Sequence, residues 1–195
     1  TPAASSLLDE AALIKIGSVG KPLARTEIQL LNSNGEIVPV GEVGEICVRG
    51  PQVMKGYLFA PEETANTIRN GWLHSGDLGR FDEEGYLYIV DRKKDMIIRG
   101  GENIYPIEVE EVLYQIPEIL EAAIVGIPHD VYGEVPKAYV VTKPDKQLTE
   151  QQVIEYCATQ LAKYKVPYEV DFIGELPRNA SGKVLKHTLR PKQTT

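Results

Sequence analysis

The stretch from Glu84 to Glu110, EGYLYIVDRKKDMIIRGGENIYPIEVE, constrains the fold more than any other part of the sequence. It contains an apolar strand pattern, the charged run Asp91–Asp95, two adjacent glycines and then Pro106 at the start of a helical pattern. One regular element cannot accommodate all four signals. We therefore predict a boundary between two small domains at the charged run, with a hinge at residues 92–95.

The residues before this boundary have the pattern of a β-rich domain. Apolar and polar residues alternate at 27–31 and again at 44–49, and Asn32-Ser33-Asn34-Gly35 is typical of a tight turn. A hairpin is expected to turn at residues 82–85, and a short helix is expected to begin at Pro61. Short strands at this spacing predict a small antiparallel, β-barrel-like subdomain over residues 1–92.

The residues after the boundary alternate between helical and strand patterns. Three segments have the pattern of strands, residues 122–127, 138–142 and 168–173. Apolar residues recur at helical spacing after Pro106, and Thr149 with Gln152 forms a capping box before a second helix. Residues 93–195 are therefore expected to form an α/β domain with a three-stranded sheet, helices and a hairpin near the end. The predicted fold class of the whole chain is α+β.

Charge and composition exclude several classes of function. The 195 residues carry a formal net charge of −7 and have a pI near 5.1, which disfavours binding to nucleic acids or anionic membranes. No apolar run approaches the length of a membrane span. Cys47 and Cys157 lack the spacing of a metal site, so we expect two reduced core thiols in a cytoplasmic protein and no metal site.

Lys183 lies in a turn signature, Asn179-Ala180-Ser181-Gly182-Lys183. An ammonium group on an exposed turn can stabilise a phosphate, or the negative charge that develops on an oxyanion, when another domain supplies the ligand. A solvated surface lysine beside a turn glycine is the alternative.

Three further positions suggest binding chemistry and leave alternatives open. Asp77 can accept hydrogen bonds from a sugar diol, or it can simply follow a turn at Gly76. Arg92 can contact a ligand or pair with a neighbouring aspartate. The pair Gly100-Gly101 lets a narrow ligand chain pass close to the backbone, or forms a loop before a helix.

The histidines do not add a catalytic pattern. His74, His129 and His187 share no spacing with a candidate nucleophile or carboxylate, and they are expected to be structural or surface residues. No phosphate-binding loop of the GxxxxGK[ST] type occurs in the sequence.

Four motifs occur in one order: GEICVRGPQVMKGY (44–57), GWLHSGDLG (71–79), YIVDRKKDMIIRGGENIYPIEVE (88–110) and PRNASGKVLK (177–186). Together they resemble the C-terminal part of the adenylate-forming AMP-dependent synthetases and ligases, and among these the fatty-acid-CoA ligase-like acyl-CoA synthetases. The resemblance covers essentially the whole chain. It implies an enzyme that uses ATP to convert a carboxylic acid to an acyl-adenylate, and then transfers the acyl group to CoA.

The resemblance also implies roles for the polar candidates. Asp77 corresponds to the aspartate that holds the ribose hydroxyls of the nucleotide, and Arg92 to the arginine that assists it. Lys183 corresponds to the catalytic lysine that contacts the carboxylate and the α-phosphate during adenylation.

A second group of residues corresponds to segments that change position between the two half-reactions in enzymes of this family. Lys94 matches the hinge about which the C-terminal domain rotates between the half-reactions. Gly100, Gly101 and Glu102 match the CoA-binding segment along the pantetheine path. Adenylation requires Lys183 at the reacting atoms, whereas thioester formation requires the glycine segment there, so rotation about one hinge serves both steps.

Other family motifs are absent from the sequence. The phosphate-binding loop rich in Ser, Thr and Gly is missing, as is the Tyr-Gly-x-Thr-Glu motif with the glutamate expected to hold Mg²⁺. The chain is therefore expected to be a fragment that is inactive alone, with the Mg²⁺ ligands in the missing N-terminal domain. A homodimer and a peripheral association with a membrane are both compatible with the resemblance.

Two other functions compete with this one. An adenylation domain that loads a carrier protein is the first alternative, although Gly101-Glu102-Asn103-Ile104-Tyr105-Pro106 favours the CoA ligases. A non-catalytic binding module is the second, and the joint presence of Asp77, Arg92 and Lys183 argues against it.

Overall fold

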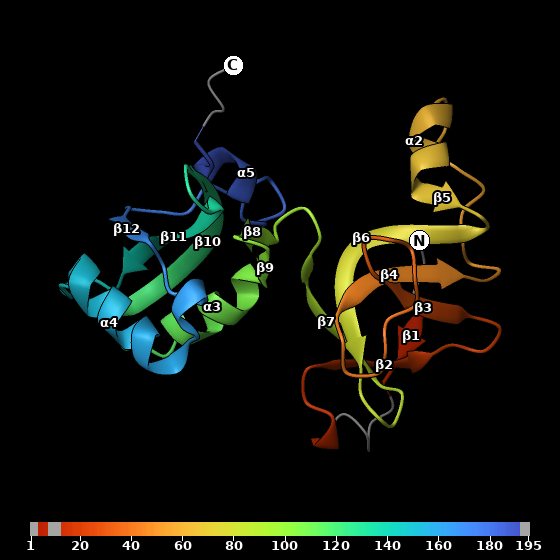
Figure 1. Ribbon diagram of the computed structural model, residues 1–195, viewed down its shortest axis with the longest axis horizontal. Coiled ribbons are helices and arrows are strands. Elements are labelled where there is room, and N and C mark those ends of the chain that lie inside the picture. Colours follow the sequence, from red (N-terminus) through yellow and green to blue (C-terminus); the bar gives the residue numbers. More distant parts are fainter. Residues whose placement is uncertain (1–3, 8–12, 192–195) are drawn as a thin grey trace. The chain divides into compact units, whose positions relative to one another are not determined.

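The computed structural model describes residues 4–7 and 13–191 of the chain. The chain divides into two compact units, Thr1–Lys94 and Asp95–Thr195 (Figure 1). Each unit has its own sheet and its own apolar core. Within the described ranges, no helix is both long enough and apolar enough to cross a membrane.

The first unit is built on one antiparallel sheet. Its elements in chain order are β1 (Ser5–Ser6), β2 (Ser18–Pro22), β3 (Glu27–Leu31), β4 (Gly44–Arg49), α2 (Pro61–Thr67), β5 (Ile68–Arg69), β6 (Trp72–Phe81) and β7 (Leu87–Arg92). The seven strands have the order β1-β2-β7-β6-β4-β3, and β5 pairs with β6. Figure 1 shows β6 bending along its length, and its register with β7 shifts between Leu78 and Gly79. The predicted antiparallel, β-rich architecture is confirmed, and the sheet is curled.

Strand β4 differs from the alternating pattern predicted for it. All five residues from Gly44 to Val48 are buried, and Glu45 is only 6% exposed. Since β4 pairs with β3 on one edge and β6 on the other, it is an interior strand of the sheet. A buried carboxylate requires partners, and the section below describes those of Glu45.

The second unit combines a mixed sheet with helices. Its elements in chain order are β8 (Ile97–Arg99), β9 (Glu102–Ile104), α3 (Pro106–Leu113), β10 (Ile119–His129), β11 (Gly133–Thr142), α4 (Glu150–Gln160), the 3₁₀ helix η1 (Lys163–Lys165), β12 (Glu169–Phe172) and α5 (Lys186–Leu189). The sheet has five strands rather than the three predicted. The two additional strands, β8 and β9, are three residues long and therefore too short to show a clear period.

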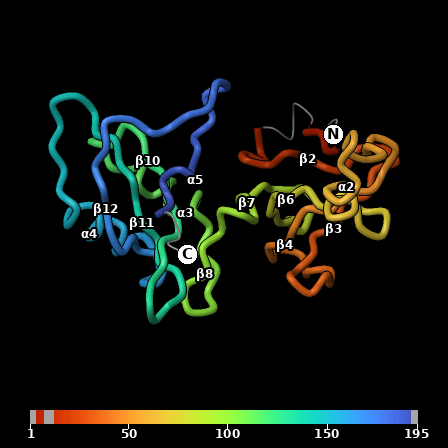
Figure 2. The backbone as a smooth tube through the Cα atoms, turned by 90° about the horizontal axis from the view of Figure 1, so that it is seen from above, coloured from red at the N-terminus to blue at the C-terminus, as the bar shows by residue number. Residues whose placement is uncertain are grey.

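The long apolar strand β10 explains how this unit forms layers. Ala122 and Ile124 pack with helices α3 and α4, whereas the alternate residue Ala123 packs with Leu176 of the tail, close to α5. Side chains of a strand point alternately to opposite faces, so a continuous apolar run is expected where both faces are covered. Figures 1 and 2 show β11 beside β10, with which it pairs along its whole length.

The predicted capping box at the start of α4 is present. The Thr149 side chain accepts a hydrogen bond from the backbone N–H of Gln152, and the Gln152 side chain accepts one from the backbone N–H of Thr149. Val153 and Cys157 of this helix are fully buried, as the helical spacing predicted.

Candidate active site

Asp77 and Arg92 form a direct ion pair in the first unit. They are register partners on the adjacent strands β6 and β7, and the distance from Arg92 Nε to Asp77 Oδ1 is 2.8 Å. The Asp77 side chain is 33% exposed and the Arg92 side chain 45%. This contact holds one carboxylate oxygen of Asp77, while Oδ2 has no donor among the residues that the structure describes. The pair can thus offer an oriented acceptor to a ligand.

An irregularity within strand β6 places the Asp77 carboxylate, because the register of β4 with β6 shifts between the pairs Glu45–Leu78 and Cys47–His74. Gly76 has a φ of +73°, a left-handed conformation that glycine adopts without a steric penalty. The backbone N–H of Asp77 donates to Ser75 Oγ at 3.1 Å, and that of Lys93 donates to the Gly76 carbonyl at 2.9 Å. The Ser75–Asp77 segment is therefore tied to the end of β7.

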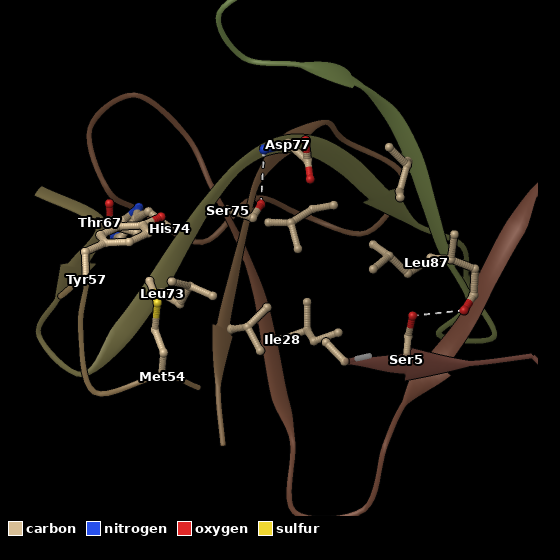
Figure 3. A pocket seen from close by; sticks show the side chains of 15 residues that line it. Ser5, Ile28, Met54, Tyr57, Thr67, Leu73, His74, Ser75, Asp77 and Leu87 are labelled. Carbon is tan, nitrogen blue, oxygen red and sulfur yellow. Dashed lines mark hydrogen bonds between the residues drawn. The ribbon is translucent and has the colours of Figure 1, made fainter. Parts of the chain in front are cut away.

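A pocket of about 490 Å³ lies beside this segment (Figure 3). Its lining is largely apolar, and Figure 3 shows Ser75 and Asp77 next to each other at one side, with the hydrogen bond between them. His74, Thr67 and Tyr57 also line this pocket (Figure 3). A largely apolar pocket with a small number of polar groups is the usual form of a small-molecule site.

The predicted CoA-binding residues form one tight hairpin in the second unit. Strands β8 and β9 pair from Ile97 and Ile104 to Arg99 and Glu102, so Gly100 and Gly101 make the turn between them. Both glycines have positive φ values, +59° and +93°, as a two-residue type I′ hairpin turn requires. Glu102 is exposed, and a Cβ on Gly101 would meet no atom within 4 Å. The space beside Gly101 is open, whereas a Cβ on Gly100 would lie 3.6 Å from Tyr132 Cδ1.

Lys183 lies on an exposed turn in the tail of the same unit. The side-chain oxygen of Asn179 accepts hydrogen bonds from the backbone N–H groups of Ser181 and Lys183, at 3.1 and 2.9 Å. Arg178 clamps the turn by donating to the Gly182 carbonyl at 2.7 Å and pairing with Glu121. The backbone is therefore held in place, while the described residues offer no hydrogen-bond or ion-pair partner to the Lys183 ammonium.

The structure brings some predicted residues together and leaves others apart. Asp77 and Arg92 are in contact in the first unit, and Lys94 is the last residue of that unit. The glycine hairpin and Lys183 belong to the second unit and lie on different elements of it.

Sequence reasoning missed a buried polar cluster in the first unit. His74 Nδ1 lies 3.1 Å from Glu45 Oε2 and 3.3 Å from Cys47 Sγ, and the Lys93 ammonium lies 2.9 Å from the same Glu45 oxygen. His74 is thus part of a network of β4 and β6, as a structural histidine. The one available signal was a glutamate inside the otherwise apolar run GEICV.

Burial and charge shift the pKa values of this cluster. Burial alone would raise the pKa of the Glu45 carboxyl, but hydrogen bonds from Lys93 and His74 outweigh it, so the pKa falls below its ordinary value. Burial, together with the nearby Glu45 charge, raises the pKa of the Cys47 thiol to about 11. Burial raises that of Cys157 to about 11 as well, so both free cysteines are protonated at neutral pH.

Two known protein domains match the sequence. The AMP-binding enzyme domain matches residues 1–58, and the AMP-binding enzyme C-terminal domain matches residues 108–183. The 2-succinylbenzoate–CoA ligase of Bacillus mycoides (strain KBAB4) is 50% identical over 178 residues, which are 91% of this chain and 36% of that protein. The corresponding ligase of Bacillus cereus (strain Q1) is 49% identical over the same shares of the two chains. The chain thus spans about a third of the length of these relatives.

Solved structures of similar proteins share the fold. The o-succinylbenzoate CoA synthetase MenE of Bacillus subtilis, in complex with the acyl-adenylate OSB-AMP, is 44% identical with a TM-score of 0.87, over 95% of this chain and 38% of that one. ATP-bound MatB of Rhodopseudomonas palustris is 41% identical with a TM-score of 0.84, over 89% and 35%. The amide bond synthetase McbA of Marinactinospora thermotolerans is 37% identical with a TM-score of 0.82, over 89% and 36%.

Proposed function

The chain belongs to the adenylate-forming family of AMP-binding enzymes, and from this we propose that it is the C-terminal part of an ATP-dependent acyl-CoA ligase. In the full-length ligase a carboxylate attacks the α-phosphorus of ATP and pyrophosphate leaves. The thiol of CoA then attacks the acyl carbon of the adenylate, and AMP leaves. The relatives' names and the two matched domains support this reaction.

The contact between Asp77 and Arg92 is the observation that carries the proposal. The guanidinium holds one oxygen of the carboxylate at 2.8 Å, so the second oxygen is positioned to accept hydrogen bonds from the ribose hydroxyls. Lys183 supplies the positive charge that offsets the negative charge developing on the phosphorus. The turn that carries Lys183 is clamped through Asn179 and Arg178, and this favours a lysine presented to a ligand.

The glycine hairpin fits the second half-reaction. Gly101 leaves open space beside the turn, and a narrow pantetheine chain needs such close access to a backbone. Lys94 is proposed as the hinge between the half-reactions, because the chain passes from one compact unit to the other immediately after it. The ligands of Mg²⁺ are proposed to lie in the remainder of the full-length ligase. A MenE structure with ATP and a magnesium ion is consistent with this requirement.

We assign 2-succinylbenzoate as the acid to be tried first, because the relatives at 49–50% identity are named for it. A fatty acid, which the motifs alone suggested, is the second candidate. The test measures ATP–pyrophosphate exchange by the full-length ligase with 2-succinylbenzoate, fatty, short-chain and aryl acids. The largest kcat/KM is expected for 2-succinylbenzoate, and exchange with none of the acids would contradict the adenylation function.

The identity of the molecule that accepts the acyl group needs a separate measurement. CoA is expected to take the acyl group from the adenylate, with the thioester detected by mass spectrometry. A pantetheinylated carrier protein and a primary amine serve as comparison acceptors, the amine because McbA is an amide bond synthetase. Transfer to the carrier protein alone would favour the carrier-loading alternative. The 195-residue chain by itself is expected to show no exchange.

A further inference from the structure

The carboxylate of Glu45 connects strands β6 and β7, which carry the proposed nucleotide-binding residues, to the residues just before the proposed hinge at Lys94. Oε2 of Glu45 accepts from Lys93 Nζ at 2.9 Å and lies 3.1 Å from His74 Nδ1. The guanidinium of Arg69 is 4.0 Å away, and Cys47 Sγ lies against the same histidine nitrogen. The Glu45 side chain is 7% exposed, so these groups replace most of its hydration.

A metal site is the first alternative for such a cluster. Glu45, Cys47 and His74 each offer one ligand atom, and these atoms lie within 4.8 Å of one another. However, Glu45 Oε2, the oxygen that lies 3.1 Å from His74 Nδ1, already faces the Lys93 ammonium, and the Arg69 guanidinium lies near it. A divalent cation would meet two positive charges there, and the thiol ligand would have to lose a proton. Charge therefore favours an ion network.

Lys93 lies beside the Asp77–Arg92 pair. It directly follows Arg92, the partner of Asp77, and its backbone N–H donates to the Gly76 carbonyl.

Glu45 attaches this segment to the neighbouring strands. Glu45 is the register partner of Leu78, the residue after Asp77. The Lys93 side chain and backbone thus attach the last residues of β7 to β4 and β6. Beyond Lys93, only Lys94 remains before the second unit begins.

We infer that Glu45 is a positioning residue that anchors Lys93, keeps the Asp77–Arg92 pair aligned and confines hinge motion to the residues after Lys93. This inference rests on the proposed function for its kinetic consequences. Without the anchor, rotation of the second unit would also displace Arg92, and the ribose contacts would be lost during the catalytic cycle. With the anchor, the nucleotide site stays intact while the other unit moves.

The test compares E45Q and K93M with the conservative variant K93R in the full-length ligase. The matched control is E27Q, which breaks the exposed Glu27–Arg49 ion pair in the same sheet. Hydrogen exchange of the backbone amides of residues 91–96 is expected to accelerate on the order of tenfold in E45Q and K93M, because a charged hydrogen bond is lost. K93R is expected to retain most of the protection, and E27Q all of it.

The kinetic readout separates positioning from general destabilisation. The KM for ATP in pyrophosphate exchange is expected to rise about fivefold in E45Q and K93M with kcat little changed, because the ribose contacts bind the ground state and the transition state alike. A merely unstable enzyme would lose active fraction, which lowers the apparent kcat and leaves KM unchanged.

Three outcomes would overturn the inference. The first is an unchanged rate of amide hydrogen exchange at residues 91–96 in both E45Q and K93M, which would show that Glu45 does not anchor Lys93. The second is an equal increase of this rate in E27Q, which would show a general effect on the sheet. If the unsubstituted ligase shows no pyrophosphate exchange with any acid, the proposed function fails, and the hydrogen-exchange comparison still decides the anchor. Stoichiometric Zn²⁺ bound by the unsubstituted ligase but not by C47S would favour the metal site and overturn the ion network.

Discussion

At the scale of single residues, Lys183 carries a positive charge on an exposed turn whose backbone is held by Asn179 and Arg178. Replacing it with alanine removes this charge and leaves the turn intact. The adenylation rate of the full-length ligase is expected to fall by about 10²–10³-fold, the usual cost of losing a preorganised group at developing negative charge. Pyrophosphate exchange measures this step, and K146A, at an exposed lysine of the same unit, is the control. Pyrophosphate exchange at an unchanged rate in a folded K183A variant would refute the catalytic role proposed for Lys183.

Glu45 predicts a specific dependence of stability on pH. Its pKa is lowered in the folded protein from the ordinary value of 4.5, so the folded state favours the charged form. The stability that this group contributes is therefore fully present above about pH 4.5 and is lost as the pH falls through the folded pKa.

The unfolding free energies of the chain and of E45Q, measured with urea between pH 7 and pH 3, test this dependence. Their difference is expected to be largest at neutral pH and to shrink below about pH 4.5. The surface variant E42Q controls for the loss of one negative charge. A difference that stays constant across this range would show that the Glu45 charge is not what stabilises the fold.

At the scale of elements, helix α4 depends on the capping box at its start. Substituting Thr149 with alanine leaves the N–H of Gln152 without its side-chain acceptor, and the unfolding free energy is expected to fall by about 1 kcal/mol. T159A, near the C-terminal end of the same helix, removes a hydroxyl without removing the cap. Urea denaturation of the 195-residue chain compares the two variants. Equal losses of unfolding free energy in T149A and T159A would show that the cap does not stabilise the helix.

At the scale of the whole molecule, the proposed mechanism needs a change in the arrangement of the two units at Lys94. Proline restricts φ to about −65° and also restricts the preceding residue, so K94P is expected to favour one orientation. The thioester step should slow more than adenylation. Single-turnover transfer from preformed acyl-adenylate to CoA measures the first effect, and pyrophosphate exchange measures the second. Equal slowing of both steps would count against a hinge at this residue.

The sequence by itself determined the features that depend on neighbours along the chain. The turn at residues 82–85, the capping box of Thr149 and the doubly buried strand at residues 122–127 are all present in the structure. Each feature depends on a local backbone preference or on a short hydrophobic period. Consecutive residues of the sequence are enough to show either of them. The two short strands that flank Gly100 and Gly101 escaped prediction, because three residues cannot define a period.

Only the tertiary structure decided which distant residues meet. Asp77 and Arg92 are both visible as polar residues in the sequence, but their 2.8 Å contact depends on the register of β6 and β7. The burial of Glu45 depends on strands on both sides of β4 and on Lys93, 48 residues further along the chain. Such contacts arise from strand pairing, which a pattern within one strand cannot specify.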